Sequence, residues 1–143
     1  MKIRTEWQGK RKFKSLSSRN HEVMMDAVPD VGGENAGSSP MELVLMGLTG
    51  CMGIDVTMIL EKMRLAPDRL EIEAAGIRAE EPPGRFVEIH LTFHVDGDIK
   101  PDKIWRAIRL SEQKYCSVAH SLNSKVASRL LLNGKEEPPA GQS

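Results

Sequence analysis

One stretch constrains the fold of this chain more than any other, a long apolar run that starts at Pro40. Ser39 suits the N-cap of a helix, proline suits the first helical position, and Glu42 completes a Ser-x-x-Glu capping box. Between residues 43 and 60, apolar side chains occupy nearly every side of the expected helix, so most of its surface should be buried. The pattern predicts a central helix from Pro40 to residue 63 or 64.

A helix that is apolar all round needs cover on both sides. One antiparallel sheet covers a single face, and in a chain of 143 residues a second subunit is a natural source of the other cover. Gly47, Gly50 and Gly53 recur at three-residue spacing, although each glycine costs about 1 kcal/mol of helix propensity relative to alanine. They indicate that another backbone packs very close. We therefore expect a homodimer with this helix near its interface.

The segments before the helix read as strands and a loop. "KIRTEWQ", "RKFKSLSS" and "HEVMMDAV" predict an antiparallel meander, with Gly9 and Asn20 as turn residues. The glycine-rich loop from Pro29 to Gly37 leads into the helix, and it can be either a functional loop or a plain connector.

Two strands follow the helix, "RLEIEAAGIRAEE" and "RFVEIHLTFHVDGD". Period-two alternation divides the second strand into an apolar face and a more polar face. The apolar face holds Val87, Ile89, Leu91, Phe93 and Val95, and the other holds Phe86, Glu88, His90, Thr92 and His94. Because His90 and His94 lie about 13 Å apart along a strand, we assign them to the solvent face and predict no metal site.

The last third of the chain supplies "KPDKIWRAIRLSEQKY" as a second helix, "CSVAHSLNS" as a short helix or turn, and "KVASRLLLNG" as a strand. The order of elements predicts an α+β fold with a largely antiparallel sheet. We expect one domain over residues 1–134 and an unstructured tail over residues 135–143.

Composition excludes several classes of function. Lys+Arg and Asp+Glu balance at 20 each, which gives no electrostatic argument for nucleic acid or an anionic membrane as partner. The apolar helix carries Glu42 and Asp55, so we interpret it as a core helix and not a membrane span. The N-terminal residues lack the apolar core of a signal peptide, and we expect a cytoplasmic protein whose two cysteines stay reduced.

The two cysteines differ in their local sequence. Cys116 stands at the start of the expected short helix, where backbone N–H groups favour a thiolate. Lys114 flanks it, and His120 follows one helical turn later and could lie over the thiol. Cys51 is in the middle of a helix, with Asp55 one turn on disfavouring its thiolate. For each cysteine a buried packing role remains open beside a chemical one.

Several motifs resemble one family. Residues 37–43 read "GSSPMEL", a helix cysteine follows eleven residues after the proline as Cys51, and Cys116 stands in "YCSVAHSL". The chain is similar over nearly its whole length to the OsmC/Ohr superfamily of osmotically induced and organic-hydroperoxide-resistance proteins, most of all to its YhfA-like branch. This resemblance implies an OsmC-like fold, in which a long central helix packs on antiparallel sheets in an intertwined homodimer with two equivalent interface sites.

The resemblance also implies a chemistry, a thiol-dependent reduction of organic hydroperoxides in the oxidative stress response. Cys51 would be the peroxidatic thiolate, which becomes a sulfenic acid and condenses with Cys116 to a disulfide. An external dithiol would then reduce the disulfide. No metal or organic cofactor is implied.

Two positions depart from the pattern of the family's peroxidases. There a glutamate directly follows the helix-start proline and pairs with an arginine from an upstream loop. Here Met41 takes that place, Glu42 comes one residue later, and no arginine occurs between residues 21 and 63. The candidates to support the thiolate are then His120, Lys114 and Glu42, although Glu42 is more simply the capping-box residue.

These departures keep two other functions open. One is non-catalytic binding of a small apolar ligand at the dimer interface, in a pocket lined by methionines of the central helix. The other is a redox sensor whose disulfide changes a partner surface. The methionines in question are Met41, Met46, Met52 and Met58.

Overall fold

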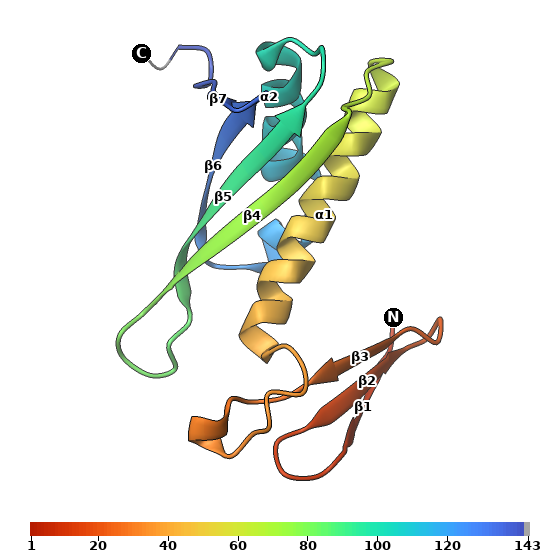
Figure 1. Ribbon diagram of the computed structural model, residues 1–143, viewed down its shortest axis with the longest axis vertical. Helices are drawn as coiled ribbons and strands as arrows, with labels where there is room; N and C mark the ends of the chain where they lie inside the picture. The colour runs from red at the N-terminus through yellow and green to blue at the C-terminus, as the bar shows by residue number, and fades with distance from the viewer. Residues whose placement is uncertain (142–143) are drawn as a thin grey trace. The chain divides into compact units, whose positions relative to one another are not determined.

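The structure is a computed structural model that describes residues 1–141. The fold contains two sheets and several helices and belongs to the α+β class, as the sequence predicts (Figure 1). The backbone divides into two units, Met1–Met46 and Gly47–Ser143, which are described separately. The long helix α1 (Pro40–Lys62) begins in the first unit and continues in the second.

The first unit is built on the predicted meander. Strands β1 (Ile3–Trp7), β2 (Phe13–Ser17) and β3 (Glu22–Met25) pair in that order, and both pairings are antiparallel. Gly9 with φ 101° and Asn20 with φ 65° adopt left-handed conformations in the connecting turns. Glycine and asparagine tolerate positive φ angles best, so these two residues made both turns predictable from the sequence.

A buried carboxylate organises the loop that follows β3. Asp26 is only 3% exposed, and its oxygens accept hydrogen bonds from the backbone N–H groups of Ala27, Glu34 and Ala36 at 2.8–3.1 Å. The Ala36 N–H group does most to hold the pKa of Asp26 below its ordinary value. The loop, which includes the short 3-10 helix η1 (Pro29–Val31), is therefore closed around one side chain.

The start of α1 agrees with the sequence prediction in detail. Ser39 Oγ accepts from the backbone N–H of Glu42 at 3.2 Å, and a Glu42 carboxylate oxygen accepts from the Ser39 N–H at 3.3 Å. This reciprocal pair is the predicted capping box, with Pro40 at the first helical position.

Within the chain α1 buries one stripe and leaves another bare. Leu48, Met52, Val56 and Leu60 are buried at four-residue spacing, whereas Ile54 is 63% exposed. A Cβ atom added at Gly47 or Gly50 would meet nothing within 4 Å. Within residues 47–141 of the second unit, the expectation of cover on all sides, with a backbone pressed against the glycines, is thus not met. By length and composition α1 could also cross a membrane, a test that core helices of soluble proteins pass too.

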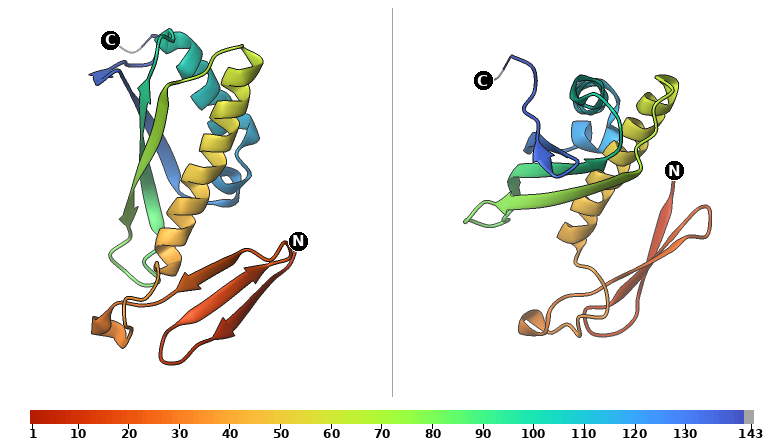
Figure 2. Two further views of the ribbon diagram at one scale, coloured as in Figure 1. Left: turned by 45° about the vertical axis from the view of Figure 1, so that its right-hand side comes forward. Right: turned by 45° about the horizontal axis from the view of Figure 1, so that its top comes forward.

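The second unit contains a four-stranded sheet in the order β4-β5-β6-β7. Its strands are β4 (Arg69–Arg78), β5 (Phe86–Asp96), β6 (Lys125–Leu132) and β7 (Lys135–Glu136). The β5–β6 pair is parallel and the other pairs are antiparallel. A parallel pair needs a long crossover, which is provided by α2 (Pro101–Leu110), the π-helical turn η2 (Ser111–Tyr115) and α3 (Ser117–Ser121). Helices α1 and α2 lie on the same face of this sheet (Figure 2).

Two details of this sheet differ from the prediction. A bulge places Val87 as an extra residue opposite the Ile77–Arg78 step, so Phe86 joins the buried face at 7% exposure. The face assignment of the residues after this bulge was correct, because Ile89, Leu91, Phe93 and Val95 are all buried.

The chain end also differs from the expected tail. Lys135 and Glu136 form β7 against β6, and the carbonyl oxygen of Glu137 accepts from Trp105 Nε1 at 2.8 Å. These contacts tie residues 135–137 to the sheet and to α2, and residues 142 and 143 of the expected tail lie outside the described residues.

The two histidines of β5 take up the predicted positions. His90 is exposed and pairs with Glu88 at 3.0 Å, and His94 Nε2 lies 3.7 Å from a Glu73 carboxylate oxygen on β4. Both contacts are polar surface pairs, which contribute little to stability.

Candidate functional site

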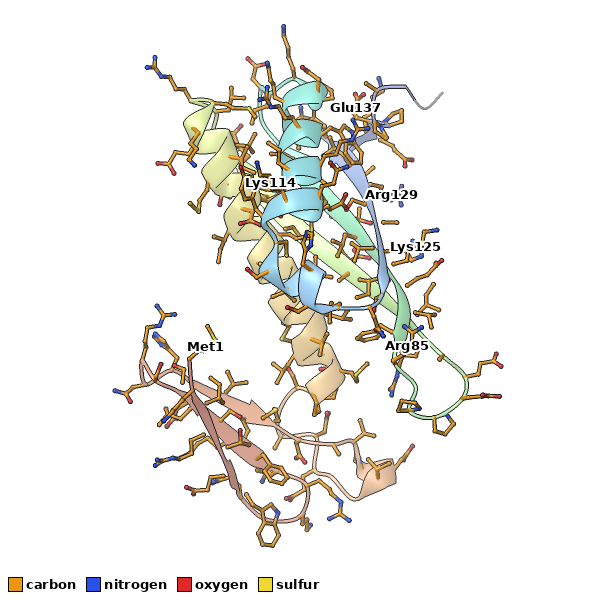
Figure 3. The ribbon with its side chains drawn as sticks, turned by 180° about the vertical axis from the view of Figure 1, so that it is seen from behind. Met1, Arg85, Lys114, Lys125, Arg129 and Glu137 are labelled. Carbon is orange, nitrogen blue, oxygen red and sulfur yellow. The ribbon has the colours of Figure 1, made fainter. Side chains whose placement is uncertain are left out.

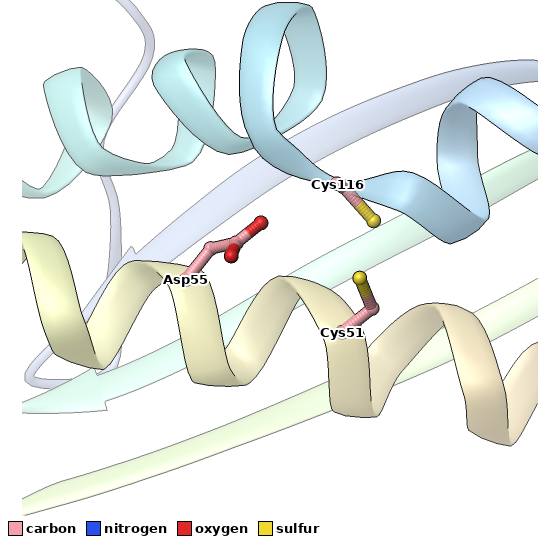
Figure 4. A group of neighbouring side chains, drawn as sticks. All are labelled: Cys51, Asp55 and Cys116. Atoms are coloured by element: carbon pink, nitrogen blue, oxygen red, sulfur yellow. The ribbon is translucent and has the colours of Figure 1, made fainter. Parts of the chain in front are cut away.

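The second unit brings both cysteines of the chain together with one acid. Cys51 and Asp55 lie one turn apart on α1, and Cys116 stands between η2 and α3. The two sulfur atoms and a carboxylate oxygen of Asp55 all lie within 4.8 Å of one another. Figure 4 shows the three side chains converging between the helix and the Cys116 turn. We call Cys51, Asp55 and Cys116 the thiol cluster.

Helix α1 positions two members of the cluster by its repeat alone. Residues four apart on a helix face the same side, so Cys51 and Asp55 point toward the same neighbour. The buried stripe of α1 lies next to this face, because Met52 directly follows Cys51 and one residue is about a 100° turn of the helix. The cluster therefore lies beside the buried core, and both Cys51 and Asp55 are half-buried.

A π-helical turn positions the third member. Residues Ser111–Tyr115 follow α2 without a break, and the Cys116 N–H donates to the Ser111 carbonyl oxygen at 2.8 Å, five residues back. Such wide turns are rare and are often found at functional sites. The same turn buries Ser111 completely, and its hydroxyl donates to Asp55 Oδ2 at 2.8 Å. One turn thus places Cys116 and fixes the Asp55 carboxylate.

Cys116 is the N-cap of α3, as the predicted helix start requires. Its sulfur is fully buried and accepts a hydrogen bond from the Ala119 N–H at 3.3 Å. Burial nevertheless raises the pKa of Cys116 to about 11, with neighbouring Cys51 adding to the effect and the Ala119 N–H opposing it. From the sequence we expected the helix start to favour the thiolate, but the N-terminus of a five-residue helix does not outweigh the desolvation of Cys116.

The side chains of the three candidate supporting residues have other partners. His120 Nε2 donates to the Glu112 carbonyl oxygen at 3.1 Å. Lys114 is exposed on the π-helical turn, with its ammonium group 5.5 Å from the centre of the Tyr115 ring (Figure 3). Glu42 is engaged in the capping box. Among residues 1–141, no hydrogen bond or ion pair joins any of these three side chains to a thiol of the cluster.

A groove of about 470 Å³ opens beside the cluster. Asp55 belongs to both the groove and the cluster, whereas neither cysteine lines the groove. Its walls are polar and apolar in nearly equal measure, and two of the lining side chains, Lys62 and Arg106, are cationic. Its lining consists of Asp55, Met58, Ile59, Lys62, Met63, Arg106, Leu110 and Tyr115.

Sequence reasoning did not identify Asp55 and Ser111 as site residues. The Cys-x-x-x-Asp spacing on a predicted helix was a usable signal for Asp55, because it places both side chains on one face. For Ser111 no such signal existed. The position of Ser111 depends on a π-helical turn, and no pattern in the sequence predicts this turn.

A sheet and long helix that hold two free cysteines side by side define a redox-related thiol protein of the α+β class. The chain belongs to the OsmC family, since the family model for OsmC-like proteins matches residues 32–130. It is 40% identical over 127 residues to protein YhfA of Escherichia coli K12, covering 88% of this chain and 92% of that protein. The predicted family and its YhfA-like branch are both confirmed.

Solved structures share the fold. A hypothetical protein from Aquifex aeolicus VF5 is 29% identical, with a TM-score of 0.76 over 92% of this chain and 96% of its own. The match to the organic hydroperoxide resistance protein OhrB of Bacillus subtilis also covers 92% of this chain and 96% of the other, with a TM-score of 0.62 and 17% identity. At that identity the likeness to OhrB shows a common fold alone.

Proposed function

We propose that this protein reduces organic hydroperoxides with Cys51 and Cys116. The observation that carries the proposal is the approach of the two sulfur atoms to within 4.8 Å of each other. Modest side-chain rotations would bring them to the bond length of a disulfide, about 2.05 Å. Family membership supports a thiol-based redox role, and the peroxide substrate is our inference from the site and from the family resemblance.

The proposed cycle has three steps. The Cys51 sulfur attacks one peroxide oxygen, the O–O bond breaks, and an alcohol leaves with the thiol proton, so Cys51 becomes a sulfenic acid. The Cys116 sulfur attacks that sulfur, the S–O bond breaks, and water leaves as the disulfide forms. An external dithiol then restores both thiols by exchange, which suits a reducing compartment such as the cytoplasm.

Accessibility supports this order of roles. Cys51 is half-buried and Cys116 is fully buried with a pKa raised to about 11. A peroxide needs an accessible thiolate, so Cys51 is the better attacking group. Cys116 meets only a sulfur that is already beside it, which is the task of a resolving thiol.

Asp55 takes the part of proton carrier in this proposal. Its carboxylate oxygen is within 4.8 Å of both sulfurs, and Ser111 holds the carboxylate by a hydrogen bond of 2.8 Å. The carboxylate can accept the Cys51 proton and pass it to the leaving alkoxide, then do the same for Cys116 and the leaving hydroxide. This role differs from that of the arginine in the family's peroxidases, because a carboxylate takes up the thiol proton and does not stabilise the thiolate by charge.

The first test is a thiol count with intact mass after one equivalent of cumene hydroperoxide at neutral pH. We expect rapid loss of both thiols and a mass decrease of two hydrogens. Cys116→Ser should still consume one equivalent and stop at the sulfenic acid, whereas Cys51→Ser should consume none. Free thiols after hours of exposure would refute the proposal.

The groove favours one second candidate, non-catalytic binding of a small apolar ligand. Its volume of about 470 Å³ is in the usual range for ligand sites, and Met58, Ile59 and Leu110 give it an apolar part. Native mass spectrometry of the protein as purified would reveal such a ligand. Cys51→Ser should retain the ligand while losing peroxide consumption, which separates the two functions.

A further inference from the structure

The thiol cluster has the composition of a metal site as well as that of a redox pair. Two sulfur atoms and one carboxylate oxygen lie within 4.8 Å of one another. In a tetrahedral zinc site the metal–sulfur bonds are about 2.3 Å and the metal–oxygen bond about 2.0–2.2 Å, so neighbouring ligand atoms are about 3.5–3.8 Å apart. Small rotations of the three side chains would close the cluster onto an ion.

We propose that the reduced protein binds one zinc ion through Cys51 Sγ, Cys116 Sγ and a carboxylate oxygen of Asp55. Thiolates together with one carboxylate suit zinc, whereas magnesium and calcium need sites made of oxygen atoms. Three protein ligands leave a fourth position for water. That position would face the groove, because Asp55 lines both the groove and the cluster.

Neighbouring groups already hold the ligands as a metal site requires. The buried Ser111 hydroxyl donates to Asp55 Oδ2 at 2.8 Å, which orients the carboxylate and leaves Oδ1 for the ion. The Ala119 N–H donates to Cys116 Sγ at 3.3 Å. Outer contacts of this kind fix the ligand orientation in known metal sites, and two of the three ligands stand on one rigid helix.

Charge also favours a cation at this position. With both thiols ionised, the cluster would carry three negative charges close together in a partly buried place. No ion pair joins a lysine or arginine of residues 1–141 to any of the three side chains. Lys62 and Arg106 line the groove together with Asp55, but a divalent ion bound directly to the sulfur atoms would neutralise the charge at the thiols themselves and allow the buried Cys116 to ionise.

The proposal uses the same thiols as the proposed peroxidase but does not depend on their reaction. A bound ion would occupy both sulfur atoms. Zinc and hydroperoxide would therefore compete, and bound zinc would protect the thiols from oxidation and alkylation.

The test is an anaerobic titration of the reduced, metal-free protein with Zn²⁺ in competition with a chromophoric chelator. Titration with Co²⁺ adds a spectrum, since tetrahedral thiolate coordination gives sulfur-to-cobalt charge-transfer bands. We expect one ion per chain and loss of binding in Cys51→Ser and Cys116→Ser. Asp55→Asn should bind about 10–100-fold more weakly, by analogy with the cost of lost metal-site partners.

Two features of the variants keep the test decisive. Asparagine can still accept the Ser111 hydrogen bond through its amide oxygen, so Asp55→Asn should fold normally. Glu61→Gln removes an exposed carboxylate of the same helix and should leave the affinity unchanged. Absence of binding in the wild type, or equal affinity in Asp55→Asn, would overturn the proposed site. Peroxide consumption by the metal-free protein is measured separately, so failure of one proposal leaves the other distinguishable.

Discussion

Cys51 and Cys116 have adjacent sulfur atoms but unequal surroundings. Cys51 is half-buried on a long helix, whereas Cys116 is fully enclosed and its pKa is raised to about 11 by burial. An ordinary cysteine has a pKa near about 8.5. The difference in environment makes the two thiols distinguishable by simple chemistry before any substrate is known.

Alkylation should show this inequality directly. With a pKa near 11, roughly one Cys116 thiol in a thousand is ionised at pH 8, so iodoacetamide should modify Cys51 first. The Cys116 rate should rise about tenfold per pH unit up to the raised pKa. Peptide mass spectrometry over a pH series measures both rates. In denaturant the two cysteines should react alike, and equal rates in the folded protein would contradict the burial argument.

Asp55 is the second residue whose role can be tested by itself. If its carboxylate carries the proton, Asp55→Asn should slow hydroperoxide consumption by about 100-fold or more without lowering the melting temperature greatly. The rate is measured by stopped flow, as the loss of free thiols after addition of one equivalent of hydroperoxide. Glu61→Gln is the matched control on the same helix. An unchanged rate in Asp55→Asn would assign Asp55 to structure alone.

At the scale of elements, the loop after β3 depends on one carboxylate. Asp26 accepts three backbone N–H groups, and the Ala36 N–H most of all lowers its pKa. A lowered pKa means that the ionised form stabilises the folded state above the ordinary pKa of aspartate, near about 3.9. This contribution is lost as the pH falls through the lower, folded-state value.

Asp26→Ala should therefore lower the melting temperature at neutral pH, because three backbone N–H groups lose the carboxylate that accepts from them. The difference from the wild type should shrink as the pH falls from about 4 towards the lower pKa of the folded state, where the wild-type carboxylate also becomes protonated. Circular dichroism melts at several pH values measure it. Asp30→Asn, an exposed residue of the same loop, should have no comparable effect, and a pH-independent loss in Asp26→Ala would argue against the ionised carboxylate.

Local signals explain which elements were predictable from the sequence. The start of α1 was predictable within one turn from Ser39, Pro40 and Glu42. The alternation of apolar and polar residues in β5 correctly predicted four buried side chains. The bulge at Val87, the π-helical turn and β7 are set by contacts with distant segments, which leave no local pattern. The local sequence around each cysteine did not predict that Cys51 and Cys116 act together. That prediction came from the family resemblance.

At the scale of the whole molecule, the bare face of α1 calls for an explanation. Ile54 and Met58 are 63% and 51% exposed, and Gly47 and Gly50 have nothing near them. These residues recur at three- or four-residue spacing, so they form one apolar stripe on the helix surface. At its N-terminal end the stripe consists of the two glycines, which have no side chain. We propose that a second copy of the chain covers this stripe in a homodimer, as the sequence analysis expected.

A charge on the stripe tests the dimer without disturbing the buried core. Ile54→Glu introduces a carboxylate at a position that is already exposed in the single chain, so folding should persist while a dimer interface there is lost. Sedimentation at micromolar concentration should change from dimer to monomer. Ile77→Glu is the control, because Ile77 is similarly exposed at 48% but stands on β4. A wild-type monomer, or a dimer that survives Ile54→Glu, would mean that the stripe is not the interface, and Gly47 and Gly50 would then need another partner to explain them.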